Sequence, residues 1–242
     1  MPRNLVQPWL IRSILVGLIS SLAGWQSVGT ALTAVRFEPP RGNAPTETKG
    51  GASRGDIACT SLTSHDTPQI VLLTPTHSNY SLTTLKRPTF LVYVSPSSAP
   101  KAFFSLKNAK GQLHYRQAFP VPEQGGIIRI TLPDSTAPLA VNHPYEWGVA
   151  LMCGGKLRPN SPFASSWVQR IQLASKVDAS LPNQPALEQA AIYGSNAVWH
   201  DMLAKLATLK QQKPQDPAIA RTWTQILDSA GLTKITSAEI VN

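Results

Sequence analysis

Short runs of strand-forming residues, separated by turn residues, fill the middle of the chain and restrict its possible folds more than any other feature. In Ile128-Arg129-Ile130-Thr131-Leu132 apolar and polar residues alternate, which is typical of a strand with one buried face. Residues 107–111 separate two such runs and predict a hairpin turn, in which Gly111 is free to take a positive φ. Strands are expected over residues 69–74, 89–95, 102–108, 112–119, 126–132, 145–153 and 167–173.

The order of these runs indicates the fold class. Turn signals recur between the short strands with no intervening helical pattern, as in two-layered antiparallel folds. We therefore expect residues 67–178 to form an antiparallel β-sandwich with an immunoglobulin-like topology. The fold is thus mainly β, with α-helices after the sandwich.

Helical periodicity replaces the strand pattern after the Pro-containing link at residues 180–185. A first helix is expected over residues 186–193, and Gly194 is expected to end it. Ser195 is then a suitable N-cap for a second helix over residues 196–210.

A third helix is expected to begin with Asp216 as its cap and Pro217 at its first position. Gly231 follows the end of this helix, where a left-handed residue is common. The second and third helices would form a C-terminal helical hairpin with one apolar side. Because such a pair cannot bury that side alone, we expect residues 184–242 to be a helical region packed on the sandwich.

The side chains of this hairpin indicate packing rather than chemistry. Trp199 and Trp223 fall on the apolar faces, where a core position is the expected role. Asp201 and Lys205 are spaced as an i, i+4 ion pair on the second helix. His200 precedes Asp201, but neighbouring helical residues point about 100° apart, so the two are not a preformed dyad.

The first 34 residues have the order of a secretory signal peptide. Arg3 and Arg12 precede an apolar run at residues 14–23, and small residues follow, with acceptable cleavage sites after Ala31 and Ala34. The run is shorter than the roughly 20 residues that a transmembrane helix needs, although a retained N-terminal anchor is the alternative. We therefore expect residues 1–34 to be a signal peptide and the protein to be exported to a periplasmic or extracellular location.

Residues 35–66 form a Gly/Pro-rich leader segment with few large apolar side chains. Within it, Gly51-Ala52-Ser53-Arg54-Gly55 matches the G-x-S-x-G pattern of a hydrolase nucleophile elbow. An elbow needs a strand before the serine and a helix after it, and neither is predicted here. A second possibility is an anion contact made by Arg54 with the backbone amides of Gly51 and Gly55.

Cys59 and Cys153 are the two cysteines of the chain. In an oxidising compartment such a pair predicts an intramolecular disulfide, and two buried free thiols are the alternative. Neither cysteine is part of a C-x-x-C motif, so a redox-active pair is not expected.

The basic charge is spread along the chain rather than clustered. The formal net charge of +9 includes Arg3 and Arg12 of the signal peptide. A nucleic-acid-binding protein more often has a basic stripe with interleaved aromatic residues, so no nucleic-acid partner is expected. A solvated basic surface is the simplest interpretation, and attraction to an anionic envelope polymer is the alternative.

No set of residues in the sequence indicates catalysis or cofactor binding. His65, His77, His114, His143 and His200 are dispersed and lack the spacing of a metal site. We therefore predict no catalytic residues, no cofactor and no metal.

Several segments resemble one known family. They are "FEPPRGNAPTETKGGASRG", "RPTFLVYV", "YEWGVALMC", "WVQRI", "AIYGSNAVWHDMLAKLATLK" and "WTQILDSAGL", in this order along the chain. Together they resemble the domain of unknown function 928, a family of exported, chiefly cyanobacterial proteins. The resemblance implies export and treats the sandwich and helices as one unit, but it implies no activity and transfers no catalytic residue. His200 stands where a Tyr is common in the family, which argues against a required chemical role there.

These observations predict a non-catalytic, exported binding or assembly module of the cell envelope. Its partner would be another envelope protein or an anionic envelope polymer. Two other functions stay open: a hydrolase that acts on envelope polymer or peptide, and a structural protein that oligomerises through its helical hairpin.

Overall fold

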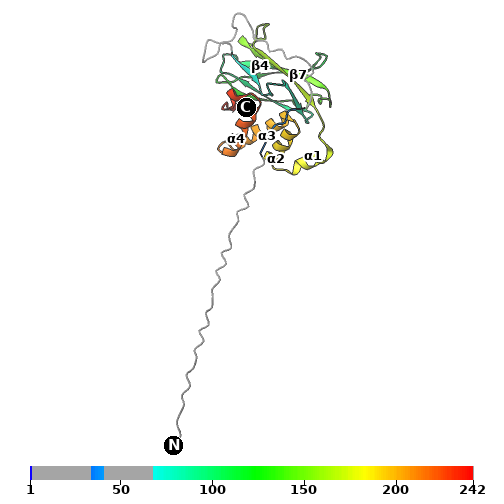
Figure 1. The fold of residues 1–242 in the computed structure, drawn as a ribbon. Coiled ribbons are helices and arrows are strands. Elements are labelled where there is room, and N and C mark those ends of the chain that lie inside the picture. Colours follow the sequence, from blue (N-terminus) through cyan, green and yellow to red (C-terminus); the bar gives the residue numbers. More distant parts are fainter. Residues whose placement is uncertain (2–33, 41–67, 242) are drawn as a thin grey trace. The chain divides into compact units, whose positions relative to one another are not determined.

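Two β-sheets and a group of helices make up the described part of the chain. This computed structural model describes residues 1, 34–40 and 68–241. Its residues from Ala34 onward belong to one compact unit (Figure 1). The strands are β1 Ile70–Leu72, β2 Tyr80–Thr83, β3 Thr89–Val94, β4 Lys101–Asn108, β5 Leu113–Pro120, β6 Gly126–Thr131, β7 Pro144–Met152, β8 Phe163–Arg170 and β9 Ile240–Val241.

The sheets are mixed, which corrects the expected all-antiparallel sandwich. One sheet has the order β1-β3-β6-β9 and the other β2-β8-β7-β4-β5. Most neighbours are antiparallel, but β2 pairs with β8 and β9 pairs with β6 in parallel. β2 and β9 were also missing from the expected strands, and the predicted strand at 167–173 begins earlier, at Phe163. Short edge strands that pair with distant partners leave little local signal, which explains why the sequence pattern missed them.

The core between the two sheets follows from the alternation of apolar residues. In β3, Phe90, Val92 and Val94 face this core, while β4 and β7 contribute Phe104 and Trp147 among others. Phe90 packs against the rings of Phe104 and Trp147 at centroid distances of 5.2 and 4.6 Å. Burial of these large side chains is the main source of sandwich stability, since each contributes roughly 1.5–3 kcal/mol.

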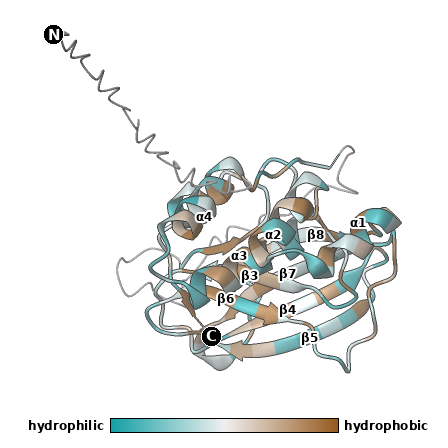
Figure 2. Cartoon of the chain, turned by 90° about the horizontal axis from the view of Figure 1, so that it is seen from below, coloured by the Kyte–Doolittle hydropathy of each residue, from teal (hydrophilic) through white to brown (hydrophobic). Residues whose placement is uncertain are grey.

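Helices α2 Ala186–Ser195, α3 Trp199–Gln212 and α4 Pro217–Ser229 cover the other face of the β1-β3-β6-β9 sheet. The short helix α1 Ser175–Ser180 precedes them and has no buried residue. Leu91 and Ile127, which point away from the sandwich core, pack instead with Leu203, Leu206 and Trp223 of α3 and α4 among others. Figure 2 shows α2, α3 and α4 on one side of the strands. The described chain is therefore layered as helices, sheet and sheet.

The ends of α4 confirm the sequence prediction. Asp216 caps the helix, since its Oδ1 accepts hydrogen bonds from the amides of Ala218 and Ile219 at 2.9 and 3.3 Å. Gly231 has φ +77°, and the amide of Leu232 donates to the carbonyl of Leu227 at 2.8 Å. This is a Schellman ending, in which Gly231 is the left-handed residue that the sequence predicts. The turn at residues 107–111 is likewise confirmed, with Gly111 at φ +75°.

The junction between α2 and α3 differs from the prediction. Gly194 and Ser195 are the last residues of α2, so Gly194 does not end the helix before it and Ser195 is not the cap of α3. The turn lies later, where Ala197 has φ +62° and the amide of Val198 donates to the carbonyl of Tyr193 at 2.9 Å.

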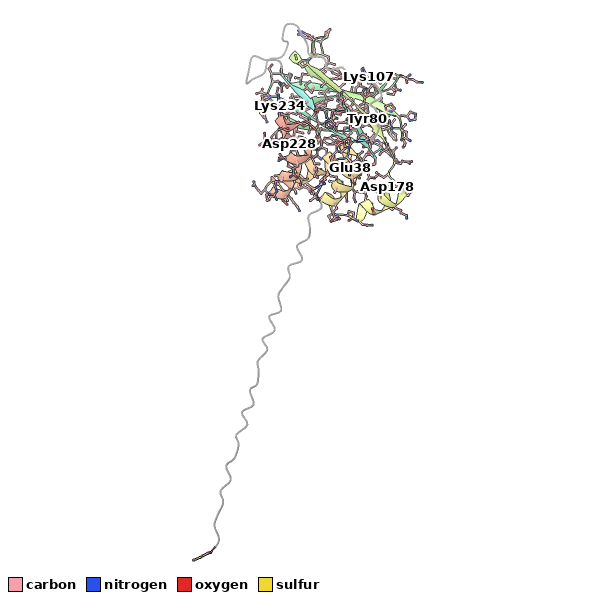
Figure 3. All side chains as sticks on the ribbon, viewed as in Figure 1. Glu38, Tyr80, Lys107, Asp178, Asp228 and Lys234 are labelled. Carbon is pink, nitrogen blue, oxygen red and sulfur yellow. The ribbon has the colours of Figure 1, made fainter. Side chains whose placement is uncertain are left out.

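A close approach explains the glycine within α2. A Cβ at Gly194 would lie 2.1 Å from the carbonyl oxygen of Arg36 and 2.9 Å from Sδ of Met202. The Glu38 amide donates to the Gly194 carbonyl at 3.1 Å, and Glu38 is labelled on the helical side of Figure 3. Residues 34–40 thus pack against the helices, an arrangement that their Pro-rich surroundings did not predict.

Among the described helices, none combines the length and the apolar character that a membrane-spanning helix needs.

Candidate functional site

An apolar groove lies at the open side of the sandwich, between the edge strand β5 and the strands β6 and β9. Its volume is about 390 Å³. The floor includes Phe119, Ile128 and Ile130, which belong to the sandwich core, and Val241 of β9 packs beside them. The lining residues are Gln117, Phe119, Pro120, Pro122, Ile128, Arg129, Ile130, Thr131 and Val241.

Strand β6 forms one wall of this groove, and part of its edge is not paired with another strand. β6 pairs with β3 along its whole length, from Gly126 to Thr131. On its other side, the ladder with β9 pairs Ile127 with Ile240 and Ile128 with Val241 and goes no further among the described residues. Strand β6 therefore extends past the end of β9.

The hydrogen-bonding pattern shows which main-chain groups lie at this edge. The amide of Leu132 donates to Pro88 beside β3, whereas the amide of Ile127 donates to Glu239 beside β9. Because neighbouring strand residues direct their main-chain groups to opposite sides, Arg129 and Thr131 share the orientation of Ile127. Beyond β9, the carbonyl of Arg129 and both main-chain groups of Thr131 are thus directed to the groove edge.

The opposite wall is less suited to strand pairing. Just past the end of β5, the amide of Val121 donates to the carbonyl of Pro100, which precedes β4. Every second residue of a strand has the same orientation, so Phe119 and Gln117 also direct their main-chain groups toward β4. Pro120 and Ala118 then face the free edge, and Pro120 has no amide hydrogen to donate. A proline is a common way to block an edge strand.

Arg129 connects the groove to helix α3. Its Nη1 and Nη2 atoms donate to Oγ1 of Thr208 and Oε1 of Gln211, both at 2.9 Å. Its Nε atom is buried and lacks an acceptor among the described residues. Burial lowers the pKa of Arg129 below its ordinary value. Arg129 is therefore a half-buried cation held against α3 rather than a fully solvated one.

A buried polar cluster joins α3 to strand β2 at a different place. Ser81 and Thr83 are fully buried, although β2 is an edge strand. The Oγ atom of Ser81 lies 2.7 Å from Nε2 of His200, and it also contacts the carbonyl of Trp167 at 3.2 Å. Asp201 accepts hydrogen bonds from the Thr83 hydroxyl at 2.5 Å and from the amide and hydroxyl of Thr84 at 2.9 and 2.5 Å.

His200 is neutral in this environment. Burial lowers the pKa of its imidazole to about 3, and a hydrogen bond to the backbone of Thr89 acts in the opposite direction. The Ser81 hydroxyl has one hydrogen, which it can donate either to Nε2 of His200 or to the carbonyl of Trp167. The ring also packs edge-on against Phe90 and Trp147, at centroid distances of 5.0 and 5.9 Å.

Asp201 does not form the ion pair that its spacing predicts. The ion pair formed by the described residues is Arg87–Asp134, at 3.9 Å, so Asp201 and Lys205 are not bonded. Burial raises the pKa of Asp201, while the bonds from Thr83 and Thr84 and the charge of Lys205 oppose that rise. The carboxylate points inward to β2 instead of outward to solvent.

The Ser81–His200 contact resembles a nucleophile and its base, but the surroundings do not suit catalysis. Ser81 has no exposed surface, and Asp201 bonds to the threonines rather than to His200. A nucleophile must reach its substrate, and its base is usually oriented by a third group. This cluster therefore fixes α3 on β2.

A second, polar pocket of about 360 Å³ lies at the far end of β8, and Arg170 is its cationic residue. Arg170 donates from Nε to the carbonyl of Thr84 and from Nη1 to that of Leu139, both at 3.1 Å. Most other lining residues, including Gln172 and Asp178, are exposed, so the pocket is shallow.

The structure describes one of the predicted site residues. Cys153 is buried directly after β7. Its predicted disulfide partner Cys59 and the proposed anion contacts Gly51, Arg54 and Gly55 lie outside the described residues, as does Ser53. Sequence reasoning missed the groove, since no motif marks a sheet edge. For the Ser81 cluster, the short alternation in "YSLT" was the one available signal.

Comparison with family models identifies the relatives of this chain. The model of the Domain of Unknown Function family DUF928 matches residues 49–240. The chain belongs to this family. The match includes the groove residues of β5 and β6 and ends one residue before Val241. A search of the curated proteins gave no match.

Two solved structures show partial similarity to this DUF928 protein. One is the CARDB domain of a Pyrococcus furiosus protein in complex with di-metal ions, with 12% identity, a TM-score of 0.28, and coverage of 44% of this chain and 94% of that chain. The other is a β-glucuronidase from Ruminococcus gnavus in complex with D-glucuronic acid, with 10% identity, a TM-score of 0.22, and coverage of 72% and 42%. At these TM-scores neither similarity bears on the function of this protein. Among the described residues, no group of three His, Cys, Asp or Glu side chains is placed to hold a metal ion.

Proposed function

We propose that this DUF928 protein is an exported, non-catalytic binding module of the cell envelope that captures an extended segment of another envelope protein. The observation that carries the proposal is the uncovered edge of β6 beside an apolar groove of about 390 Å³. Main-chain groups of Arg129 and Thr131 at this edge match the hydrogen-bonding pattern of an added strand.

The groove and the edge act together in this proposal. Main-chain hydrogen bonds contribute a net 0.5–1.5 kcal/mol each, roughly, so a short edge alone holds a segment weakly. One large apolar side chain buried against Phe119 and Ile130 would contribute about 1.5–3 kcal/mol more. The captured segment is therefore extended and places at least one apolar residue in the groove.

The packing of the helices argues against oligomerisation through the C-terminal hairpin. Trp199 and Trp223 are fully buried, and the indole of Trp199 donates to the carbonyl of Leu73 at 2.6 Å. The proposal takes α3 and α4 as a hairpin docked on an immunoglobulin-like sandwich, so their apolar faces are already used. The free part of the β6 edge, in contrast, has main-chain groups directed to the groove.

Export and a disulfide are part of the same proposal. The signal-like first 34 residues support an envelope location, and an oxidising compartment favours a Cys59–Cys153 bond. Such a bond would join the leader segment to the end of β7, near the buried position of Cys153.

The test compares two variants at one position. Thr131→Pro removes the outward amide hydrogen but leaves the ladder with β3 intact, because Ile130 and Leu132 form those bonds. Thr131→Val keeps the amide and removes the hydroxyl that contacts Thr89 at 2.9 Å. Each protein is used as bait in an envelope fraction.

A partner that is retained by the wild type and Thr131→Val, and is lost with Thr131→Pro, supports the proposal. Equal retention by all three proteins contradicts binding at this edge. If sedimentation shows that the bait itself dimerises and that Thr131→Pro makes it monomeric, the occupant is a second copy of the chain, and the proposal of a different partner is wrong.

A further inference from the structure

We infer that the captured segment alternates a large apolar residue, which faces into the groove, with an acidic residue, which faces Arg129. This inference rests on the proposed function and specifies the partner that the same site accepts. It follows from the different surroundings on the two faces of β6.

The inner face of β6 requires an apolar side chain. Ile128 and Ile130 point to the sandwich core, and Phe119 and Val241 complete the apolar part of the groove. A strand added beside β6 would direct every second side chain to this face. A charged side chain there would be buried without a partner, which is unfavourable by several kcal/mol, roughly.

The outer face of β6 requires an acceptor with a negative charge. Arg129 lies on this face, because its guanidinium bonds to Thr208 and Gln211 of α3. Both of these partners are neutral, and the Nε atom of Arg129 is buried without an acceptor among the described residues. An arginine with this environment gains most from a carboxylate, since charge-assisted hydrogen bonds are about twice as strong as neutral ones.

No acidic residue of the described chain satisfies Arg129. Glu239, which directly precedes β9, is exposed and forms no ion pair with it. Arg116 of β5 is exposed and points to the opposite face of its strand from Gln117 and Phe119, which line the groove. Among the residues that line the groove the charged one is Arg129, so an acidic segment is complementary to it.

The alternation of side chains along a strand places the apolar residue and the acidic residue of the partner at consecutive positions. In an extended segment, neighbouring side chains point to opposite faces, so an inward apolar residue is followed by an outward one beside Arg129. The matching partner sequence is thus apolar–acidic with period two.

Synthetic peptides test this inference with the exported protein. Capped seven-residue peptides alternate Val with Glu, Val with Gln, Val with Lys, or Ala with Glu, and isothermal titration measures their dissociation constants. We expect Val/Glu to bind about tenfold more tightly than Val/Lys, with Val/Gln between them, and the difference to shrink in high salt. Ala/Glu should bind more weakly than Val/Glu, because it leaves the groove empty.

Two variants separate the role of Arg129 from folding. Arg129→Gln should bring Val/Glu and Val/Lys within about twofold of each other, whereas Arg116→Gln should keep most of the preference. If thermal melting shows that Arg129→Gln is unfolded, Arg129→Lys replaces it; that variant keeps the charge and should retain part of the preference.

The outcomes distinguish the inference from the proposed function. Equal binding of Val/Glu and Val/Lys to the wild type would overturn the acidic preference and leave capture of an extended segment standing. A preference that survives in Arg129→Gln would also overturn the inference. If no peptide binds and Thr131→Pro still retains the natural partner, the groove is not the binding site and the proposed function fails.

Discussion

At the scale of single residues, the buried polar cluster shows that two neighbouring residues of α3, His200 and Asp201, bond to different positions of β2 and the residue after it. His200 bonds to Ser81 and Asp201 to Thr83 and Thr84, so α3 is fixed to β2 by polar contacts as well as by packing. A buried polar group without partners would destabilise the fold, and here each has one. The sequence correctly indicated that His200 and Asp201 are not a dyad, but it did not predict their burial.

The low pKa of His200 makes stability depend on pH. The unfolded chain binds a proton on His200 below about pH 6.5, whereas the folded protein does not until about pH 3. The unfolded state therefore holds more protons within this window, and the free energy of unfolding falls as the pH drops through it. Between pH 7 and pH 5 the loss due to His200 should be about 2 kcal/mol.

The variant His200→Gln checks this expectation. Glutamine can still bond to Ser81 but does not titrate, so the variant should be less stable at pH 7 and lose much less stability on going to pH 5. Asp201, whose pKa is raised, affects both proteins alike. Urea denaturation at the two pH values measures the difference, with the exposed His143→Gln as control. The same pH dependence in wild type and His200→Gln would refute the assignment.

At the scale of secondary-structure elements, the α2 glycine controls how residues 34–40 pack. Val35 belongs to the core of the helical layer, and the ring of Phe37 lies 4.7 Å from that of Trp199. These contacts depend on the close approach of the Arg36 carbonyl to Gly194. Glycine in a helix is unfavourable by about 1 kcal/mol relative to alanine, so the close approach must offset this.

We therefore expect Gly194→Ala to destabilise the protein, although alanine is the better helix former. The added methyl group would collide with Arg36 and Met202, which should lower the free energy of unfolding by roughly 1–3 kcal/mol. Thermal melting measures the change. Ser195→Ala, at the exposed next position of the same helix, should stay within about 0.5 kcal/mol of wild type. A stabilised Gly194→Ala would show that the contact with Arg36 does not form.

Local sequence signals predicted most strands and helix ends well, whereas elements that depend on pairing with distant residues were missed. β3, β4 and β6 match their expected ranges closely, because alternation and turn residues mark them. The Asp216 cap and Gly231 are local as well, and both were predicted. The predicted end of the first helix before Gly194 was wrong. In sequence, a glycine that is required for close packing cannot be distinguished from one that ends a helix. β9 has two residues and depends on β6, so its own sequence carries almost no signal.

At the scale of the whole molecule, the groove results from strand order, which one sequence does not contain. It exists because β5 ends one sheet while β9 covers part of β6 in the other. Apart from Val241, the residues that line it lie between Gln117 and Thr131, and they look like ordinary strand residues. The proposed function therefore depends on topology rather than on a motif.

The predicted disulfide is also a property of the whole molecule. If Cys59 and Cys153 are joined, the bond closes a long loop and stabilises the fold by about 4–5 kcal/mol at most in the chain-entropy model. If the protein is exported as proposed, it should show no reactive thiol under denaturing, non-reducing conditions, and reduction should lower its melting temperature. Two reactive thiols before reduction would contradict both the bond and the oxidising location that it implies.

Residue-resolved amide hydrogen exchange at β6 tests the open edge most directly. In the free protein, the amide of Thr131 should exchange rapidly, because it is directed to the uncovered edge, while that of Ile130, opposite Phe90, should be protected. Addition of the Val/Glu peptide should protect Thr131 and leave Ile130 unchanged. Protection of Thr131 equal to that of Ile130 in the free protein would mean that the edge is already covered, and would contradict capture of a partner strand there.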